Sequence, residues 1–119
     1  MKSWRQRRGD AGEQRAAETA RSRGYRIVAR NFRARRGELD LILARENELV
    51  VAEVRLRRNT RFGSGADTVD HRKQRRLVLA TQEFLQRHPN WQNCAIRFDV
   101  ISLDGDGGLD WIENAFFAE

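Results

Sequence analysis

The sequence predicts an α/β fold, a mixed β-sheet with flanking helices in the order α-β-β-β-α-β. Three observations predict it. Residues 10–24 begin with helix-capping residues, and residues 68–88 have the apolar spacing of a helix. Several other segments are rich in β-forming residues or alternate between apolar and polar side chains. One turn, near residue 46, is short enough to join two strands as an antiparallel hairpin.

The first helix is predicted to begin at Asp10 and to end before Gly24. Asp10 is a favourable N-cap residue, and Glu13 completes a capping box three residues later. The apolar face holds only alanines, which lets the helix lie close to the surface that it covers. Residues 1–9 are polar and basic. We therefore expect a flexible basic tail there, followed by a single domain over residues 10–119.

The strands follow a simple plan along the chain. Their composition predicts strands at residues 25–32, 38–43, 49–57 and 94–103. Trp111 and Ile112 are candidates for a short final strand. In the second strand, alternation is expected to place three leucines on one face and Asp40 on the other: Leu39, Leu41, Leu43.

The second helix is predicted from Thr68 to His88, where Pro89 closes it. Residues with helical spacing form its expected buried stripe: Leu77, Ala80, Phe84, Leu85. Lys73 lies one turn before Leu77 on that stripe. Its charged end must therefore reach water or meet an anion, and the nearest predicted anions are the carboxylates of the hairpin. The alternative is a surface lysine at the edge of the helix.

The charge is high and unevenly distributed. The chain has 119 residues, a net charge of +6 and a pI of about 10.8, which is typical of nucleic-acid-binding domains. Residues 1–36 and 55–76 are basic, whereas residues 37–54 between them are acidic. Basic flanks attract a polyanion, and an acidic island can bind a cation where the polyanion arrives. The alternative is a solvated basic surface with scattered ion pairs.

Other features of the composition exclude several classes of protein. The single cysteine, Cys94, cannot form an internal disulfide. No segment approaches the roughly 18 apolar residues of a membrane span, so no membrane partner is expected. The charged N-terminus lacks the apolar segment of a secretory signal. A cytoplasmic location is therefore expected.

The predicted hairpin between the second and third strands carries the candidate chemistry. If its turn is centred between Glu46 and Asn47, Asp40 lies opposite Glu53, with Cβ atoms about 4.5–5.5 Å apart. Two facing carboxylates repel each other unless a proton or a cation lies between them. Mg²⁺ or Mn²⁺ would bind such oxygens and activate a water against a phosphodiester. The alternative is a solvent-facing surface with ordinary cross-strand charge pairs.

Short motifs in a fixed order resemble the YraN family of predicted endonucleases. They extend over residues 10–103: Gly12-Glu13, Gly24-Tyr25, Arg30-Asn31, Gly37-Glu38-Leu39-Asp40-Leu41-Ile42, Glu53-Val54-Arg55, Phe62-Gly63, Lys73 and Arg97-Phe98-Asp99-Val100. The resemblance implies a restriction-endonuclease-like fold of the PD-(D/E)xK type, akin to archaeal Holliday-junction resolvases. Because those relatives act as dimers, it also implies a homodimer by analogy.

The resemblance further implies roles for single residues. The implied metal ligands are Glu13, Asp40, Glu53 and the carbonyl of Val54. Arg55 stands where the motif has a catalytic lysine. Arginine keeps the positive charge and can grip a phosphate, but it is effectively never deprotonated. Lys73 is therefore a second candidate for the catalytic cation. Asp99 is expected to be an ion-pair partner rather than a ligand.

The leading hypothesis is a Mg²⁺-dependent nuclease that acts on DNA, with branched DNA as a candidate substrate. Six arginines flank the proposed site and are expected to contact phosphates: Arg33, Arg35, Arg36, Arg57, Arg58, Arg61. One alternative is a catalytically silent nucleic-acid-binding module on the same fold. Another is a basic protein that associates with RNA or with the ribosome.

Overall fold

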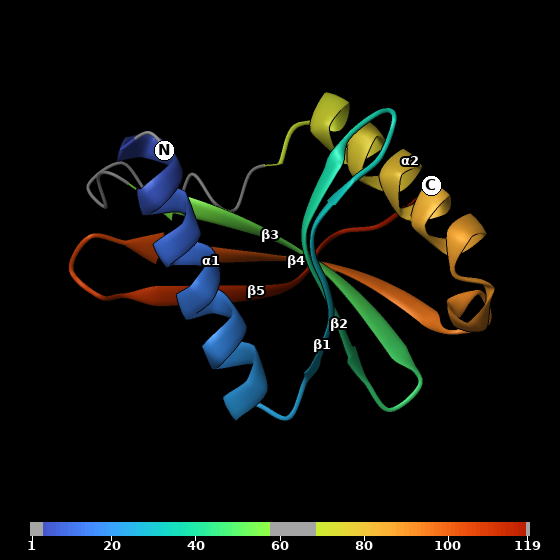
Figure 1. Cartoon of the computed structure of the whole chain (residues 1–119), viewed down its shortest axis with the longest axis horizontal. Coiled ribbons are helices and arrows are strands. Elements are labelled where there is room, and N and C mark those ends of the chain that lie inside the picture. The colour runs from blue at the N-terminus through green and yellow to red at the C-terminus, as the bar shows by residue number, and fades with distance from the viewer. Residues whose placement is uncertain (1–3, 58–68, 119) are drawn as a thin grey trace.

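The computed structural model describes residues 4–57 and 69–118 (Figure 1). The elements follow the order α-β-β-β-α-β-β, with one short 3₁₀ turn: α1 Trp4–Ser22, β1 Arg26–Arg33, β2 Glu38–Arg45, β3 Glu48–Arg57, α2 His71–Arg87, η3 Pro89–Trp91, β4 Ala95–Asp104, β5 Leu109–Phe116. The predicted α/β class, with a mixed sheet and flanking helices, is confirmed. The final strand is a full partner of β4 and not the two residues expected.

The sheet has five strands in the order β1-β2-β3-β4-β5. Strands β3 and β4 are parallel, and every other neighbouring pair is antiparallel. The parallel pair needs a long crossover, which contains α2. The predicted hairpin of β2 and β3 therefore lies at the centre of the sheet, between β1 and β4.

The two helices cover opposite faces of the sheet (Figure 1). On one face, α2 buries a stripe of Leu77, Ala80 and Phe84, as the spacing predicts. On the other face, α1 buries only three alanines: Ala16, Ala17, Ala20. The alternate residues of β3 divide between the two cores, since Val51 joins the α2 side and Val50 the α1 side. Neither helix in the described part of the chain is long and apolar enough to span a membrane.

The first helix begins earlier than the capping signal indicates. It starts at Trp4, so Asp10 is an interior residue and the predicted capping box with Glu13 does not begin the helix. Residues 4–9, assigned above to a flexible tail, are helical. They are mostly arginine and glutamine, which favour helices, and a single interior glycine costs only about 1 kcal/mol. The predicted end is confirmed, because Gly24 follows the helix with a φ of 91°.

Candidate functional site

The register of the central hairpin is confirmed. Strands β2 and β3 pair from Arg45 opposite Glu48 to Leu41 opposite Ala52, around a turn of two residues. Glu46, the first turn residue, has a φ of 56°, a left-handed conformation that suits such tight turns. One further step in the same register faces Asp40 toward Glu53, as the sequence predicts.

The backbone pairing of the two strands ends just before the carboxylates. Beyond the pair of Leu41 and Ala52, Oδ2 of Asp40 accepts a hydrogen bond of 2.9 Å from the backbone N–H of Val54. A side chain thus takes the place of a main-chain partner. The regular pairing of the two strands ends at this point, and the carboxylate of Asp40 bridges them.

The end of the regular pairing also corrects one prediction about β2. Leu39 does not share a face with Leu41: it packs in the core beneath α2, whereas Leu41 packs beneath α1. The reason is that Leu39 pairs only with Phe32 of β1, and Phe32 packs against Phe84 of α2. Strict alternation is lost where β2 no longer follows β3.

The carboxylates of Asp40 and Glu53 lie in one buried environment. Burial, together with the charge and hydrogen bonding of Glu53, raises the pKa of Asp40 from 3.8 to about 8, although the Val54 N–H acts to lower it. Glu53 is only 7% exposed. Its Oε2 is buried and receives no N–H or O–H hydrogen bond from the described residues. A proton or a cation between the two groups would relieve their mutual repulsion.

The predicted position of Lys73 beside the carboxylates is confirmed. Helix α2 begins after Asp70, whose side chain accepts a hydrogen bond of 2.8 Å from the backbone N–H of Lys73. The cap places Lys73 in the first turn, one turn before Leu77. Its Nζ lies 3.3 Å from Oε1 of Glu53, and its side chain stays 46% exposed. The ammonium group of Lys73 thus contacts the buried Glu53, and the side chain is still exposed enough to meet a ligand.

Glu13 approaches the pair from the other helix. The adjacent Gly12 lies so close to the sheet that an added Cβ would stand 3.1 Å from side-chain carbons of Leu56 and Leu103. The charge of Glu13 contributes to the raised pKa of Asp40. Within residues 4–57 and 69–118, however, no three carboxylate, histidine or cysteine side chains are close enough to hold a metal ion. Direct ligation by Glu13, or by the Val54 carbonyl, stays a prediction.

The remaining predicted cations have different surroundings. Arg55 is half-buried and follows Glu53 by two positions on β3, so it lies on the same side of the strand. Arg57 forms ion pairs with Asp110 at 3.0 Å and with Asp104 at 3.8 Å, and its side chain is 14% exposed. Its charge is thus already compensated within the protein.

The other arginines expected to contact phosphates fall into two groups. Arg33, Arg35 and Arg36 are exposed at the turn between β1 and β2. Arg58 and Arg61 lie outside the described residues. Phosphate binding by either group is a prediction.

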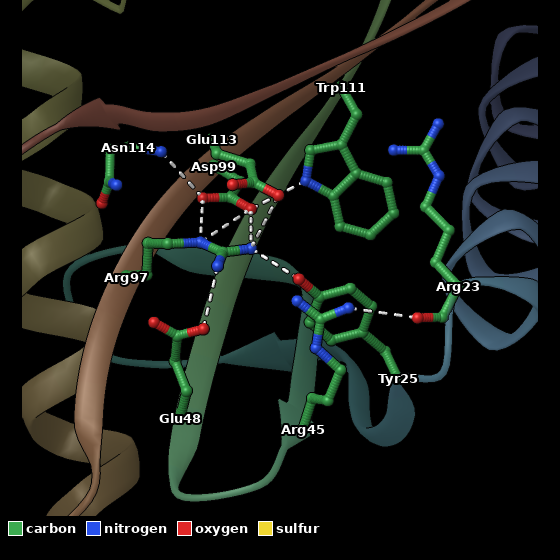
Figure 2. A network of polar contacts seen from close by, with 9 residues as sticks. All are labelled: Arg23, Tyr25, Arg45, Glu48, Arg97, Asp99, Trp111, Glu113 and Asn114. Carbon is green, nitrogen blue, oxygen red and sulfur yellow. Dashed lines mark hydrogen bonds and ion pairs between the residues drawn. The ribbon is translucent and has the colours of Figure 1, made fainter.

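A second buried polar cluster, shown in Figure 2, lies elsewhere on the sheet. The expectation that Asp99 is an ion-pair partner is confirmed, since Arg97 Nη2 lies 2.8 Å from its Oδ2. Asp99 is 1% exposed and also accepts hydrogen bonds from Arg97 Nε, from Trp111 Nε1 at 2.7 Å and from the Asn114 N–H at 3.1 Å. Its hydrogen bonds with Arg97 are the main reason why the pKa of the arginine is raised.

The sequence predicted an ion-pair role for Asp99 but neither its partner nor its wider surroundings. Arg97 also donates to the Tyr25 hydroxyl at 2.7 Å and to Glu48 at 2.8 Å. Tyr25 stacks on Trp111, with ring centres 5.3 Å apart, and the guanidinium of Arg45 covers the tyrosine ring (Figure 2). The available signal was the presence of two opposite charges, two positions apart, in an otherwise apolar strand.

These features define an α/β protein with an acidic site where the regular pairing of two central strands ends, flanked by a lysine from a covering helix. The model of the uncharacterised protein family UPF0102 matches residues 12–103, a range that contains every described member of that site. The chain therefore belongs to the UPF0102 family, the YraN family that the motifs indicated.

The similarity to individual members of the family extends over nearly the whole chain. A UPF0102 protein of Xanthomonas campestris pv. campestris (strain B100) is 47% identical over 117 residues, which cover 98% of this chain and 96% of the relative. One from Pseudomonas putida (strain GB-1) is 44% identical over 114 residues, covering 92% and 93%. Another, from Pseudomonas fluorescens (strain Pf0-1), is 41% identical over 109 residues and covers 91% of each.

Proposed function

We propose that this protein is a cytoplasmic, metal-dependent nuclease that acts on DNA. The observation that carries the proposal is the buried pair of Asp40 and Glu53, in which Oε2 of Glu53 has no hydrogen-bond donor among the described residues. Carboxylates inside proteins are normally held by several donors or by a cationic partner. Here the two carboxylates have one backbone donor and one half-exposed lysine between them, so the pair is suited to a divalent cation, which offers positive charge to both groups.

The two carboxylates match the way in which magnesium is usually held. Mg²⁺ often binds through one or two carboxylates, keeps several waters and accepts phosphate oxygens in their place. Asp40 and Glu53 would hold Mg²⁺ or Mn²⁺, with Glu13 and the carbonyl of Val54 as further candidate ligands. A bound ion of this kind polarises a phosphodiester and activates a water molecule.

Two cationic side chains would act on the phosphate beside this pair. In hydrolysis a water oxygen bonds to phosphorus, one P–O ester bond breaks, and the proton from the water passes to the departing oxygen. Lys73 has three donors and lies 3.3 Å from Glu53, so it can contact a phosphate oxygen and remain paired. Arg55 can donate two hydrogen bonds to the phosphate, but it does not accept a proton.

The proposal is tested by incubating plasmid and four-way-junction DNA with the protein in Mg²⁺, in Mn²⁺ and in EDTA. We expect cleavage only with a metal. Asp40→Asn and Glu53→Gln should abolish it and leave DNA binding intact or slightly stronger, since a negative charge near the phosphate is removed. Glu46→Gln is the matched control, because it removes an exposed carboxylate from the other end of the same hairpin. Cleavage by Asp40→Asn at the wild-type rate would refute the proposal.

A binding module without turnover is the second candidate, and Arg55 in place of the motif lysine favours it. Thermal melting with and without metal separates the two. A protein with a carboxylate metal site is stabilised by Mg²⁺ through mass action, by about 2.7 kcal/mol at a hundredfold excess over Kd. Asp40→Asn should lose that stabilisation. A pure binder melts at the same temperature in Mg²⁺ and in EDTA.

A further inference from the structure

Five of the seven exposed arginines without described partners gather on two neighbouring elements. Many other arginines of the described residues are engaged in ion pairs, hydrogen bonds or contacts with rings: Arg15, Arg23, Arg26, Arg30, Arg45, Arg57, Arg87, Arg97. Seven exposed arginine side chains, by contrast, form no ion pair, hydrogen bond or ring contact with a described residue. Arg21 on α1 and Arg75 on another face of α2 lie apart, whereas the other five lie together. Three lie at the β1–β2 turn and two in the first turns of α2, and together we call them the arginine surface: Arg33, Arg35, Arg36, Arg72, Arg76.

Direct contacts join the two elements. A Cβ added to Gly37, in the turn, would stand only 3.1 Å from the carbonyl oxygen of Arg76 in α2. The backbone N–H of Arg35 donates a hydrogen bond of 2.8 Å to Glu83, further along the same helix. Figure 1 shows the tip of the β1–β2 hairpin beside the first turns of α2. The arginines of both elements therefore belong to one continuous surface.

This concentration of charge does not serve the stability of the fold. Arg72 and Arg76 are four residues apart on α2, a spacing at which like charges repel. They also lie near the N-terminal, positive end of the helix, where the carboxylate of the N-cap Asp70 accepts the backbone N–H of Lys73 and the first turn itself contains no acidic residue. A cluster that opposes helix formation and has no partner within the described protein indicates an anionic ligand.

The arginine surface lies next to the carboxylate site. In a helix, successive residues are about 100° apart, so Arg76 and Arg72 lie about 60° and 100° around α2 from Lys73. Lys73 itself contacts Glu53. An anion that extends across the arginine surface is thereby led toward the carboxylates.

The surroundings favour a ligand that presents phosphates rather than unstacked bases. Sites for single strands combine positive charge with exposed aromatic side chains. Among the described residues, the exposed large apolar side chains are Leu56 and Phe117. Phe117 shares a shallow hollow with Arg75 on another face of α2, and Leu56 lies beneath α1. Neither belongs to the arginine surface.

We infer that the arginine surface binds the phosphate backbone of double-stranded DNA and aligns it with Asp40 and Glu53. The inference rests on the proposed function, because it takes DNA as the ligand. It adds Arg72 and Arg76 to the phosphate contacts, and it selects a duplex over a single strand.

Fluorescence anisotropy in EDTA tests the inference without any need for cleavage. A labelled duplex, a thymidine oligonucleotide of equal length and an RNA duplex are titrated at several salt concentrations. Affinity falls as salt rises, and each lost phosphate contact reduces the steepness of log affinity against log salt by about 1. Raising the salt from about 50 to 200 mM weakens the binding of both proteins. The factor by which it weakens should be roughly tenfold smaller for the double variant Arg72→Gln/Arg76→Gln than for the wild type. Arg75→Gln, which removes an exposed charge from another face of α2, should keep the wild-type slope.

The outcomes separate this inference from the proposed function. A reduced slope in the double variant, with the DNA duplex bound most tightly, supports the inference even if no cleavage occurs. An unchanged slope, an equal loss in Arg75→Gln, or tighter binding of the single strand or the RNA duplex overturns it. Metal-dependent cleavage that Asp40→Asn abolishes would support the nuclease in each of those cases. Circular dichroism confirms that the variants are folded.

Discussion

The sheet carries two buried groups of charged residues, and they differ in how their oxygens are satisfied. Both oxygens of Asp99 accept hydrogen bonds, from Arg97, Trp111 and the Asn114 backbone (Figure 2). At the other group, Asp40 receives one backbone hydrogen bond, and Oε2 of Glu53 receives none from a described donor. We call the Asp99 group the complete cluster, because both of its carboxylate oxygens have hydrogen-bond donors. We call the Asp40 and Glu53 group the incomplete pair, because one of its oxygens has no described donor.

The difference distinguishes a structural cluster from the group for which we propose a function. A buried charge with a full set of partners holds distant elements together: here it joins β4 and β5 to Tyr25, just before β1. A carboxylate pair with one backbone donor and one half-exposed lysine is expected to lower the stability of the metal-free protein, and a bound cation would offset that cost. Natural proteins retain local costs of this kind mainly at functional sites.

The largest expected effect is on the complete cluster. Asp99→Ala should lower the free energy of unfolding by about 3–5 kcal/mol, because it leaves the buried charge of Arg97 without its main partner. Urea unfolding followed by circular dichroism measures the change. Glu113→Gln is the matched control: Glu113 is 58% exposed and 3.7 Å from Arg97, so its loss should cost less than about 1 kcal/mol. Equal effects of the two variants would show that the cluster is not structural.

The incomplete pair should respond with the opposite sign. Asp40→Asn should raise the stability of the metal-free protein by roughly 1–3 kcal/mol at alkaline pH, since an amide removes the charge and can still accept from the Val54 N–H. Between pH 3.8 and about 8, the folded protein binds a proton at Asp40 that the unfolded chain has released. The stability of the wild type should therefore fall as the pH rises through this range. Urea midpoints in EDTA at several pH values test this, and a wild-type profile as flat as that of the variant would contradict it.

A smaller effect on stability is expected at Lys73, the cation beside the incomplete pair. Lys73 is 46% exposed, so Lys73→Ala should cost less than about 1 kcal/mol of folding free energy. Any metal-dependent cleavage should nevertheless fall roughly 10²-fold, the usual loss when one charged donor is removed from a reacting centre. Arg55→Lys should raise cleavage if the arginine limits it. If neither variant changes a rate that Asp40→Asn abolishes, neither side chain is catalytic.

Local patterns were sufficient to predict the core of the candidate site. The turn at Glu46 fixes the register of the hairpin, and register alone decides that Asp40 faces Glu53. Helical spacing placed Lys73 on the buried stripe before Leu77, and the structure brings it to Glu53. Both inferences depend on residues close together in the sequence, where the geometry of strands and helices leaves few choices.

Features that depend on tertiary contacts could not be predicted in this way. The change of face at Leu39 arises because the pairing of β2 with β3 ends, and no alternation pattern records where pairing ends. The donors to Asp99 include Trp111, and Arg97 also reaches Tyr25, which lies 72 residues away in the sequence. The early start of α1 was missed because Asp10, a residue that often caps helices, is also tolerated inside one.

The smallest expected effect concerns the arginine surface. Like Oε2 of Glu53, its side chains have no partner among the described residues. Arg72→Gln and Arg76→Gln should each raise the stability by roughly 0.5 kcal/mol at low salt, because each removes a positive charge from the N-terminal half of α2. Arg87→Gln is the control of opposite sign: Arg87 lies in the last turn and pairs with Glu83 at 2.6 Å, so its loss should lower the stability. Calorimetry at about 0.01 M and about 1 M salt measures both effects, which should vanish as the Debye length falls from about 30 to 3 Å. A loss of stability in Arg72→Gln or Arg76→Gln would mean that these arginines support the fold, and the charge would then no longer mark a surface kept for a ligand.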